Sequence, residues 1–415
     1  MEQHDIEVLR ALGRQVAEIA ALPAQEETRR LWWALNGLRP VRPLVMIDEL
    51  PWNEMDVDGD LVAEAEDPFC RGLETTLRRT LYQWRHFPVD MVVESEVYIP
   101  KTIRTTGFGL VVQGATLSME SENEIVSHEY GDQLSDEEGV HRIRTPELTL
   151  DEEATARDEA RAHEIFDGIL DVRMQGWIPP FYLWDDIVTW RGGEAVLYDL
   201  IDRPDHMHEI ARRYTDASLG MLDQLEEKGL LGYNAPLVHC TGAWTDELPA
   251  PGFDPARPRA KDNWTRGASQ ILGSVSKTMY EEFEIKYVSR WHARFGLTNY
   301  GCCDPLHDRV DLIRRIPNVR KISMSPWADV DKGAEAIGRD YVFSWKPNPA
   351  GLAMDSWDAG AVEADIRHTM EACERNGCAL GITLKDISTV RHRPERVWEW
   401  ARIASRLFGR EACIW

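Results

Sequence analysis

Two short segments of the sequence place potential metal-binding side chains next to each other. His239 and Cys240 are adjacent in the segment VHCTG, and Cys302 and Cys303 are adjacent in the segment YGCCDPLH. Imidazole and thiolate are the ligands that Zn²⁺ prefers, and a catalytic zinc site keeps one position open. Bound zinc would hold a substrate thiol as a thiolate, or polarise a carbonyl group or a water molecule. These four residues are candidate metal ligands, although each cysteine could instead be a small buried apolar residue.

Charged side chains follow the same cysteine pair and end two later apolar segments. Asp304 and His307 could accept or shuttle a proton. Lys346 and Lys385 could bind a carboxylate or a phosphate, or could form a structural ion pair. These four are the candidate catalytic side chains. The residues predicted to contact substrate are Trp244, Tyr300, Trp327, Asn348 and Asp386.

Short apolar segments alternate with long amphipathic ones after residue 236, which predicts strand–helix units that position these side chains. The expected strands are 237–240, 297–303, 321–325, 341–346 and 381–385, and the expected helices are 273–294, 307–316, 330–337, 361–375 and 394–408. Such alternation specifies parallel strands with right-handed crossovers. The carboxyl ends of all the strands then lie on one face, where a (β/α) barrel builds its active site.

An open doubly wound sheet would satisfy the same alternation. Such a sheet usually begins with a glycine-rich turn that binds a nucleotide, and neither G-x-G-x-x-G nor G-x-x-x-x-G-K-[ST] occurs in this sequence. We therefore predict an α/β fold, a (β/α)8 TIM barrel. Residues 1–37 would form a helical N-terminal extension and residues 38–415 a single catalytic domain, with a β-rich insertion at about 105–149.

The composition limits the classes of partner. The formal charge of −24 would repel a nucleic-acid backbone over most of the surface. The sequence has neither an apolar stretch of the roughly 20 residues needed to cross a bilayer nor a typical signal peptide at its start. Seven cysteines, an odd number, favour reduced thiols over a disulfide framework. We expect a cytoplasmic enzyme that acts on a small molecule and binds neither nucleic acid nor membrane.

From about residue 40 onward the sequence resembles the uroporphyrinogen decarboxylase superfamily, a (β/α)8 barrel family that includes cobalamin-linked methyltransferases. The resemblance is clearest in YGCCDP at 300–305, KISMSPW at 321–327 and KDIS at 385–388. The G-N-L-D-P turn of the decarboxylases is matched only at Gly301, Asp304 and Pro305, and their R-Q-A-G-R and G-H-G signatures have no counterpart. This pattern is closer to the methyltransferases than to the tetrapyrrole decarboxylases.

The methyltransferase branch binds zinc through an H-x-C motif and a later cysteine. His239 occupies the histidine position of this motif, while Thr241 stands at the first cysteine position, one residue after Cys240. Cys302 and Cys303 precede Asp304 at the later position. The resemblance thus implies a zinc site that is shifted by one residue.

Two functions follow from these observations. The first is a zinc-assisted methyltransferase that works with a corrinoid carried by a separate partner protein. The alternative is a cofactor-independent decarboxylase or lyase for a carboxylated or tetrapyrrole-like substrate, with Asp304 as acid and base and Lys346 and Lys385 as carboxylate anchors. The helical extension, which contains Trp32 and Trp33, would cover the barrel or join two subunits in a homodimer.

Overall fold

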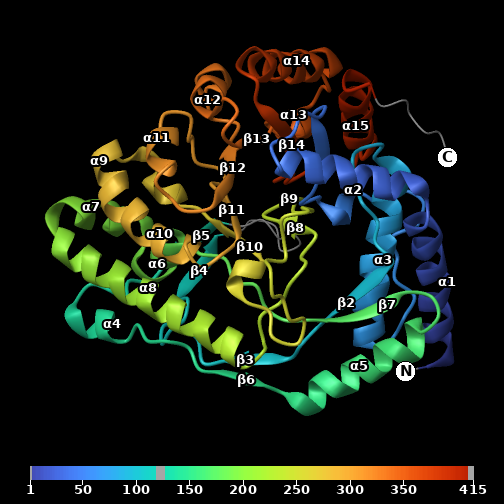
Figure 1. Ribbon diagram of the computed structural model, residues 1–415, viewed down its shortest axis with the longest axis horizontal. Helices are drawn as coiled ribbons and strands as arrows, with labels where there is room; N and C mark the ends of the chain where they lie inside the picture. Colours follow the sequence, from blue (N-terminus) through green and yellow to red (C-terminus); the bar gives the residue numbers. More distant parts are fainter. Residues whose placement is uncertain (1, 118–126, 410–415) are drawn as a thin grey trace.

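A six-stranded parallel sheet forms the centre of the molecule (Figure 1). The structure is a computed structural model that describes residues 2–117 and 127–409. In spatial order the strands are β1 (Leu44–Ile47), β14 (Ala379–Leu384), β13 (Val342–Trp345), β12 (Val319–Met324), β11 (Leu297–Tyr300) and β10 (Trp264–Gly267). Every neighbouring pair is parallel. The predicted α/β class and the parallel sheet are therefore confirmed.

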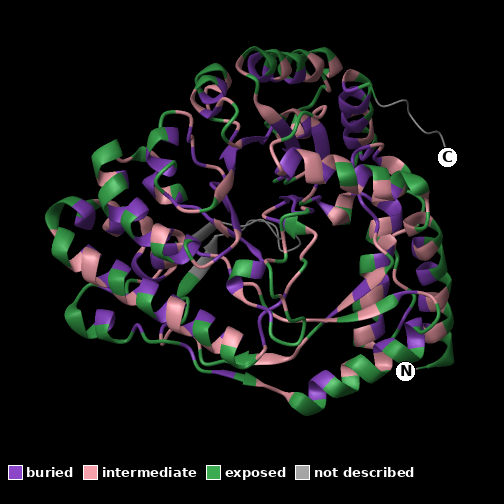
Figure 2. Ribbon diagram, viewed as in Figure 1, coloured by how far each residue is buried: buried purple, intermediate pink, exposed green. Residues whose placement is uncertain are grey.

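Helices cover the outer side of this sheet because each presents an apolar stripe to it. In α15 (Glu395–Leu407), for example, Val397, Trp400 and Ala404 are buried at helical spacing against the sheet. The packed pairs are α10 (Lys286–His292) with β10, α12 (Val330–Ile337) with β13, α14 (Ala359–Asn376) with β14, and α15 with β1. Figure 2 shows buried residues along the strands and exposed residues on the outward faces of the helices.

The N-terminal region contributes helices and a second pair of parallel strands. Helix α1 (Gln3–Ala20) packs on α3 (Pro68–His86) and α5 (Glu152–Phe166), while α2 (Pro23–Asn36) lies against β1 and β14. Strand β2 (Glu96–Pro100) pairs in parallel with β7 (Asp171–Gln175). Beyond β7, Trp177 forms an isolated parallel bridge with Leu231, and Phe181 forms another with Gly267 at the end of β10.

The segment between residues 103 and 150 begins and ends on the antiparallel pair β3 (Ile103–Thr105) and β6 (Leu148–Leu150). It contains the antiparallel strands β4 (Gly114–Leu117) and β5 (Ser127–Tyr130) and the short helix α4 (Glu137–His141). The remaining helices are η1 (Trp52–Glu54), α6 (Leu183–Arg191), α7 (Gly193–Asp202), α8 (Pro204–Glu227), η2 (Ala260–Asp262), η3 (Gln270–Ser274), α9 (Lys277–Tyr280), the π-helix η4 (Glu281–Ile285), α11 (Val310–Ile313) and α13 (Ala350–Ala353). No helix in the described ranges is long and apolar enough to cross a membrane.

A short β-hairpin lies in the middle of the molecule, inside the curve of the sheet (Figure 1). It consists of β8 (Leu237–Val238) and β9 (Thr241–Gly242), which pair antiparallel. Strand β8 contacts β10, and β9 contacts β14. Because β10 and β14 are four positions apart in the sheet order, the sheet must curve around the hairpin.

Three sequence predictions were wrong in detail. Residues 237–240 are not a sheet strand, because the chain reverses at His239 and Cys240 to form the hairpin. Residues 273–294 are not one helix but the succession η3, α9, η4 and α10. The helix expected at 307–316 is reduced to the single turn of α11, since a loop from the end of β11 occupies its first residues. Strand β10 was not predicted, because its four residues WTRG show no apolar run.

Candidate functional site

The tip of the β8–β9 hairpin carries His239 and Cys240. Both have positive φ angles, 45° and 62°, which non-glycine residues adopt at a cost of roughly 1 kcal/mol each. The neighbouring residues hold this conformation, since the Nζ of Lys321 in β12 donates to the Gly242 carbonyl at 2.6 Å and to Thr241 Oγ1 at 3.2 Å. Strained backbone that the surroundings maintain in this way is typical of functional sites.

The side chains of three strand ends meet the hairpin tip. Glu49 follows β1, Cys302 and its neighbour Cys303 follow β11, and Lys385 follows β14. The Lys385 Nζ lies 3.3 Å from Glu49 Oε2 and 3.7 Å from Cys302 Sγ. All these groups lie at the carboxyl edge of the parallel sheet, as the sequence predicted for His239, Cys240, Cys302, Cys303 and Lys385.

The thiols are connected to one another and to carboxylates. Cys240 Sγ donates to Glu49 Oε1 at 2.7 Å, and the sulfur atoms of Cys302 and Cys303 lie 3.5 Å apart. Cys303 Sγ in turn lies 3.5 Å from Asp386 Oδ2, which also forms a 3.0 Å ion pair with Lys385. The predicted residue Asp386 therefore belongs to this cluster. Glu49 belongs to it as well and was not predicted.

The surroundings of Cys302 favour its thiolate form. A hydrogen bond from Cys303 and the positive charge of Lys385 lower the pKa of Cys302, and the nearby imidazole of His239 adds to this effect, although burial opposes the shift. Burial raises the pKa of Cys240, and its hydrogen bond to Glu49 adds to the effect. Of these thiols, Cys302 is thus the one best suited to carry negative charge at neutral pH.

Lys346 lies at the border of the cluster. It is 1% exposed, and its Nζ donates to Ser344 Oγ at 3.3 Å. Burial lowers the pKa of Lys346 to about 8, and nearby Lys385 adds to this, while Cys240 and Cys302 act in the opposite direction. A lysine with such a pKa can exchange a proton near neutral pH.

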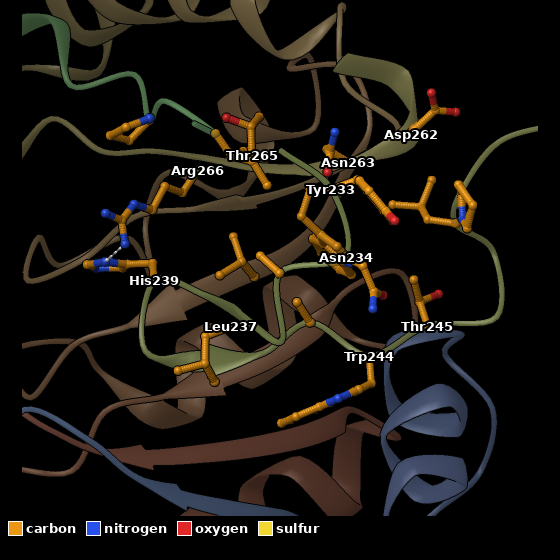
Figure 3. Close-up of a pocket in the computed structure, with 18 of the residues that line it drawn as sticks. Tyr233, Asn234, Leu237, His239, Trp244, Thr245, Asp262, Asn263, Thr265 and Arg266 are labelled. Carbon is orange, nitrogen blue, oxygen red and sulfur yellow. Dashed lines mark hydrogen bonds between the residues drawn. The ribbon is translucent and has the colours of Figure 1, made fainter. Parts of the chain in front are cut away.

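The imidazole of His239 faces the cluster on one side and a cavity on the other. Its Nδ1 lies 3.4 Å from the Tyr182 hydroxyl. The same nitrogen lies 3.5 Å from Arg266 Nη1 (Figure 3). Its Nε2 is buried and has no hydrogen-bond partner among the residues that the structure describes. Burial of a nitrogen without a hydrogen-bond partner costs free energy, so His239 Nε2 is suited to bind a ligand atom or a metal.

The cavity beside His239 has a volume of about 520 Å³ and runs from Arg266 toward the N-terminal helix α2. Figure 3 shows His239 and Arg266 close together, with Trp244 and Thr245 farther along the wall. Trp244, a predicted substrate contact, therefore lines this cavity. Arg266 was not predicted, because its strand was not recognised.

The other predicted residues lie away from the thiol cluster. Tyr300 is fully buried, and its hydroxyl bonds to Tyr280 and donates to Glu284 at 2.9 Å, because its side chain points from β11 toward the helices. Asn348 Oδ1 accepts a hydrogen bond from the Ala350 N–H at 2.9 Å. The Asn348 side chain therefore stabilises a backbone turn and does not point to a ligand. Trp327 is 71% exposed.

Asp304 and His307 follow the cysteine pair but do not face it with their side chains. Asp304 is 2% exposed, and its Oδ1 accepts the backbone N–H of Cys302 at 2.9 Å. Asp304 therefore fixes the backbone that carries Cys302. His307 lies near Asp329, which begins helix α12, and its Nδ1 is buried without a partner in the described part of the chain.

Within residues 2–117 and 127–409, no three His, Cys, Asp or Glu side chains are arranged at metal-binding spacing. The ammonium of Lys385 instead lies among the donors, between Glu49, Asp386 and Cys302. The types of donor still fit zinc, since a buried imidazole nitrogen without a partner adjoins a thiol that favours its thiolate form.

Comparison with known proteins finds matches among solved structures. No family model matches the chain, and no curated protein matches it. Among solved structures, a methyltransferase from Methanosarcina mazei is similar over 92% of this chain and 99% of that chain, with 13% sequence identity and a TM-score of 0.48. Nothing about the function of this chain follows from a likeness of that degree.

Proposed function

We propose that the chain is a methyltransferase of the uroporphyrinogen decarboxylase-like superfamily that transfers a methyl group at a thiol. The observation that carries the proposal is the meeting of His239, Cys240 and Cys302 with the Lys385 ammonium at one edge of the sheet. Sulfur must be deprotonated to act as a nucleophile, and a nearby cation favours its deprotonated form.

The fold proposed to support this chemistry is a (β/α)8 barrel. The six-stranded sheet would continue from β1 and from β10 through the segments at 90–100 and 171–181. In support, the Asp90 N–H donates to the Val45 carbonyl of β1, β2 pairs with β7, and Phe181 bridges to Gly267 of β10. The β2–β7 pairing and the bridge from Phe181 to Gly267 are parallel.

The proposed metal is Zn²⁺, with His239 and Cys302 as ligands together with Cys240 or Cys303. Bound there, it would lower the pKa of a substrate thiol and hold the thiolate beside the methyl donor. The proposed methyl donor is a corrinoid on a separate partner protein. During transfer, a sulfur–carbon bond forms and the bond from the methyl group to its donor breaks, with the electron pair remaining on the donor.

The chain's own residues would orient and stabilise this reaction. Lys385 places a positive charge beside sulfur, and its ion pairs with Glu49 and Asp386 keep the ammonium in position. Nearby thiols and carboxylates raise the pKa of Lys385 against the effect of burial, so it stays protonated at neutral pH. Asp304 positions the Cys302 backbone through its hydrogen bond to the amide.

The lyase alternative needs Asp304 as acid and base at the substrate. Asp304 is 2% exposed and already accepts a backbone hydrogen bond, so the geometry favours a positioning role over proton transfer to a ligand. The buried Lys346 and Lys385 could still bind a carboxylate. Metal-free activity that is lost in Asp304→Asn would favour the lyase.

The decisive experiment is zinc analysis of the purified protein and three variants. We expect about one zinc per chain in the wild type and much less in His239→Ala and Cys302→Ala, because each removes a ligand. Cys70→Ala is the matched control, since Cys70 is a buried thiol in the separate core formed by α1, α3 and α5. The rate of methyl transfer from free methylcobalamin to a small thiol should fall in His239→Ala and Cys302→Ala and stay near the wild-type rate in Cys70→Ala. Zinc-free wild-type protein, with His239→Ala behaving like the wild type, would contradict the proposal.

A further inference from the structure

The cavity beside His239 contains a cation that has no carboxylate partner among the described residues. Arg266 projects from β10, and its guanidinium lies 3.5 Å from His239 Nδ1 and 5.5 Å from the centre of the Tyr182 ring. No carboxylate in the described part of the chain forms an ion pair with it. A partly buried guanidinium in this position is suited to an anionic ligand.

Of the other charged residues of the cavity wall, Arg29 and Asp262 are in ion pairs and Glu94 accepts hydrogen bonds from neutral donors. Arg29 bonds to Glu26 at 2.8 Å, and Asp262 bonds to Arg259 at 2.7 Å. Glu94 accepts hydrogen bonds from the indole N–H of Trp244 and from the hydroxyl of Tyr98, both at 2.9 Å. Among the described residues of the wall, Arg266 is therefore the cation without a carboxylate partner, although the whole chain carries −24. The negative charge of Glu94 lies beside Trp244, farther along the cavity wall from Arg266 (Figure 3).

The body of the cavity is aromatic. Its aromatic lining residues are Trp33, Tyr233, Trp244, Phe253 and Trp264. Tyr233 and Phe253 also pack on each other, with ring centroids 4.9 Å apart. Aromatic faces and edges favour a flat aromatic ligand, and a volume of about 520 Å³ is large enough for a small organic molecule.

We propose that this cavity binds a small aromatic carboxylate, with the carboxylate on Arg266 and the ring among the aromatic side chains. A single guanidinium matches the two oxygens of one carboxylate, whereas the higher charge of a phosphate would favour a second cation, and the other cation of the wall, Arg29, is already paired with Glu26. The ligand would lie beside His239. This assignment rests on the proposed function in making the methyl-accepting thiol part of an aromatic carboxylate.

Binding without turnover tests the inference. We choose naphthoate, naphthamide, which lacks the charge, and decalin carboxylate, which lacks the aromatic rings, and measure the affinity of each by titration calorimetry. We expect naphthoate to bind about tenfold more tightly than either analogue, because only naphthoate makes both the charge-assisted bond and the ring contacts. Equal affinity for naphthoate and naphthamide would overturn the assignment of the anion site, and equal affinity for naphthoate and decalin carboxylate would overturn the aromatic part.

Variants of two arginines on the same wall locate the anion. Arg266→Gln should weaken naphthoate binding about tenfold and leave naphthamide binding unchanged. Arg266→Lys should have a smaller effect, because it keeps the positive charge and loses only the two parallel N–H donors of the guanidinium. Arg29→Gln is the matched control and should bind naphthoate like the wild type, since Arg29 is already paired. Equal losses in Arg266→Gln and Arg29→Gln, or no loss in either Arg266 variant, would overturn the inference.

The result is separable from that of the proposed function. Zinc analysis and methyl transfer do not enter these titrations. If naphthoate binds through Arg266 while no methyl transfer is found, the cavity assignment stands and the proposed reaction is wrong. If zinc and methyl transfer are present while Arg266→Gln leaves the affinity for naphthoate unchanged, the proposed reaction stands and the proposed substrate class is wrong.

Discussion

The ammonium nitrogen of Lys385 lies 3.7 Å from the sulfur of Cys302 and places a cation among thiols and carboxylates. Glu49 and Asp386 pair with the same nitrogen, at 3.3 and 3.0 Å. The lysine therefore compensates negative charge on sulfur whether or not a metal is bound. A zinc ion and this ammonium would both act on the same thiolate, and they can be separated experimentally.

Replacement of Lys385 by methionine should make Cys302 less reactive. Loss of the nearby positive charge raises the pKa of the thiol, so alkylation by iodoacetamide at neutral pH should slow by about tenfold in chelator-treated protein. Mass spectrometry of the peptide that contains Cys302 measures the rate. Lys332→Met is the control, because Lys332 is an exposed lysine that pairs with Asp329 at 2.9 Å. An unchanged rate in Lys385→Met would show that Lys385 does not control the thiol.

Lys346 should make stability depend on pH in the alkaline range. Burial lowers its pKa from 10.5 to about 8 in the folded protein. Between these two values the unfolded chain binds the proton and the folded chain does not, so this lysine adds stability as pH rises from about 8 to 10.5.

The measurement compares Lys346→Met with the wild type. At pH 7 the variant should be more stable, by on the order of 3 kcal/mol at most, because the wild type must bury a charge there. The difference in melting temperature should shrink as the pH rises through that window. A difference that is constant with pH would mean that Lys346 is not buried as a titrating group.

The backbone at Cys240 gives a prediction about strain. Glycine adopts a φ of 62° without steric cost, whereas alanine meets the same strain as cysteine. Cys240→Gly should therefore be about 1 kcal/mol more stable than Cys240→Ala, although both lack the thiol. Thermal unfolding of the two variants provides the comparison. If alanine were the more stable of the two, the turn would not have the left-handed conformation.

Asp304 should prove to be a positioning residue. Asparagine retains an oxygen that can accept the Cys302 N–H, so Asp304→Asn should keep both the stability and the Cys302 alkylation rate close to wild type. Asp304→Ala leaves that amide without its partner and should cost about 2 kcal/mol in denaturant unfolding. A loss of enzymatic activity in Asp304→Asn, with the fold intact, would favour a role in proton transfer.

The parallel sheet could be predicted because its strands are short apolar runs between amphipathic helices. Strands β12, β13 and β14 lie within two residues of their predicted positions. The hairpin could not be recognised, because its turn consists of His239 and Cys240 in place of the asparagine and glycine that normally signal such a turn. A segment with that composition has the same pattern as a single strand.

The site could be predicted in part. The thiols and Lys385 stand out because polar groups at the ends of apolar strands meet on one face. Glu49 could not be found, since its partner Lys385 lies 336 residues farther along the chain and no local pattern connects them. Tyr300 was misassigned because alternate side chains of a strand point to opposite faces, and the sequence alone did not show which face Tyr300 would take.

The pairing of β1 with β14 affects how the protein forms during synthesis. Leu44 of the first strand aligns with Gly381 of the last strand, so the N-terminal strand has no neighbour on this side until almost the whole chain has left the ribosome. Cys240 and Cys302 are synthesised well before Lys385 and at first lack its ammonium. A nascent or stalled chain would therefore expose thiols of ordinary reactivity. The pKa of Cys302 would be lowered by Lys385 only when β14 has joined the sheet.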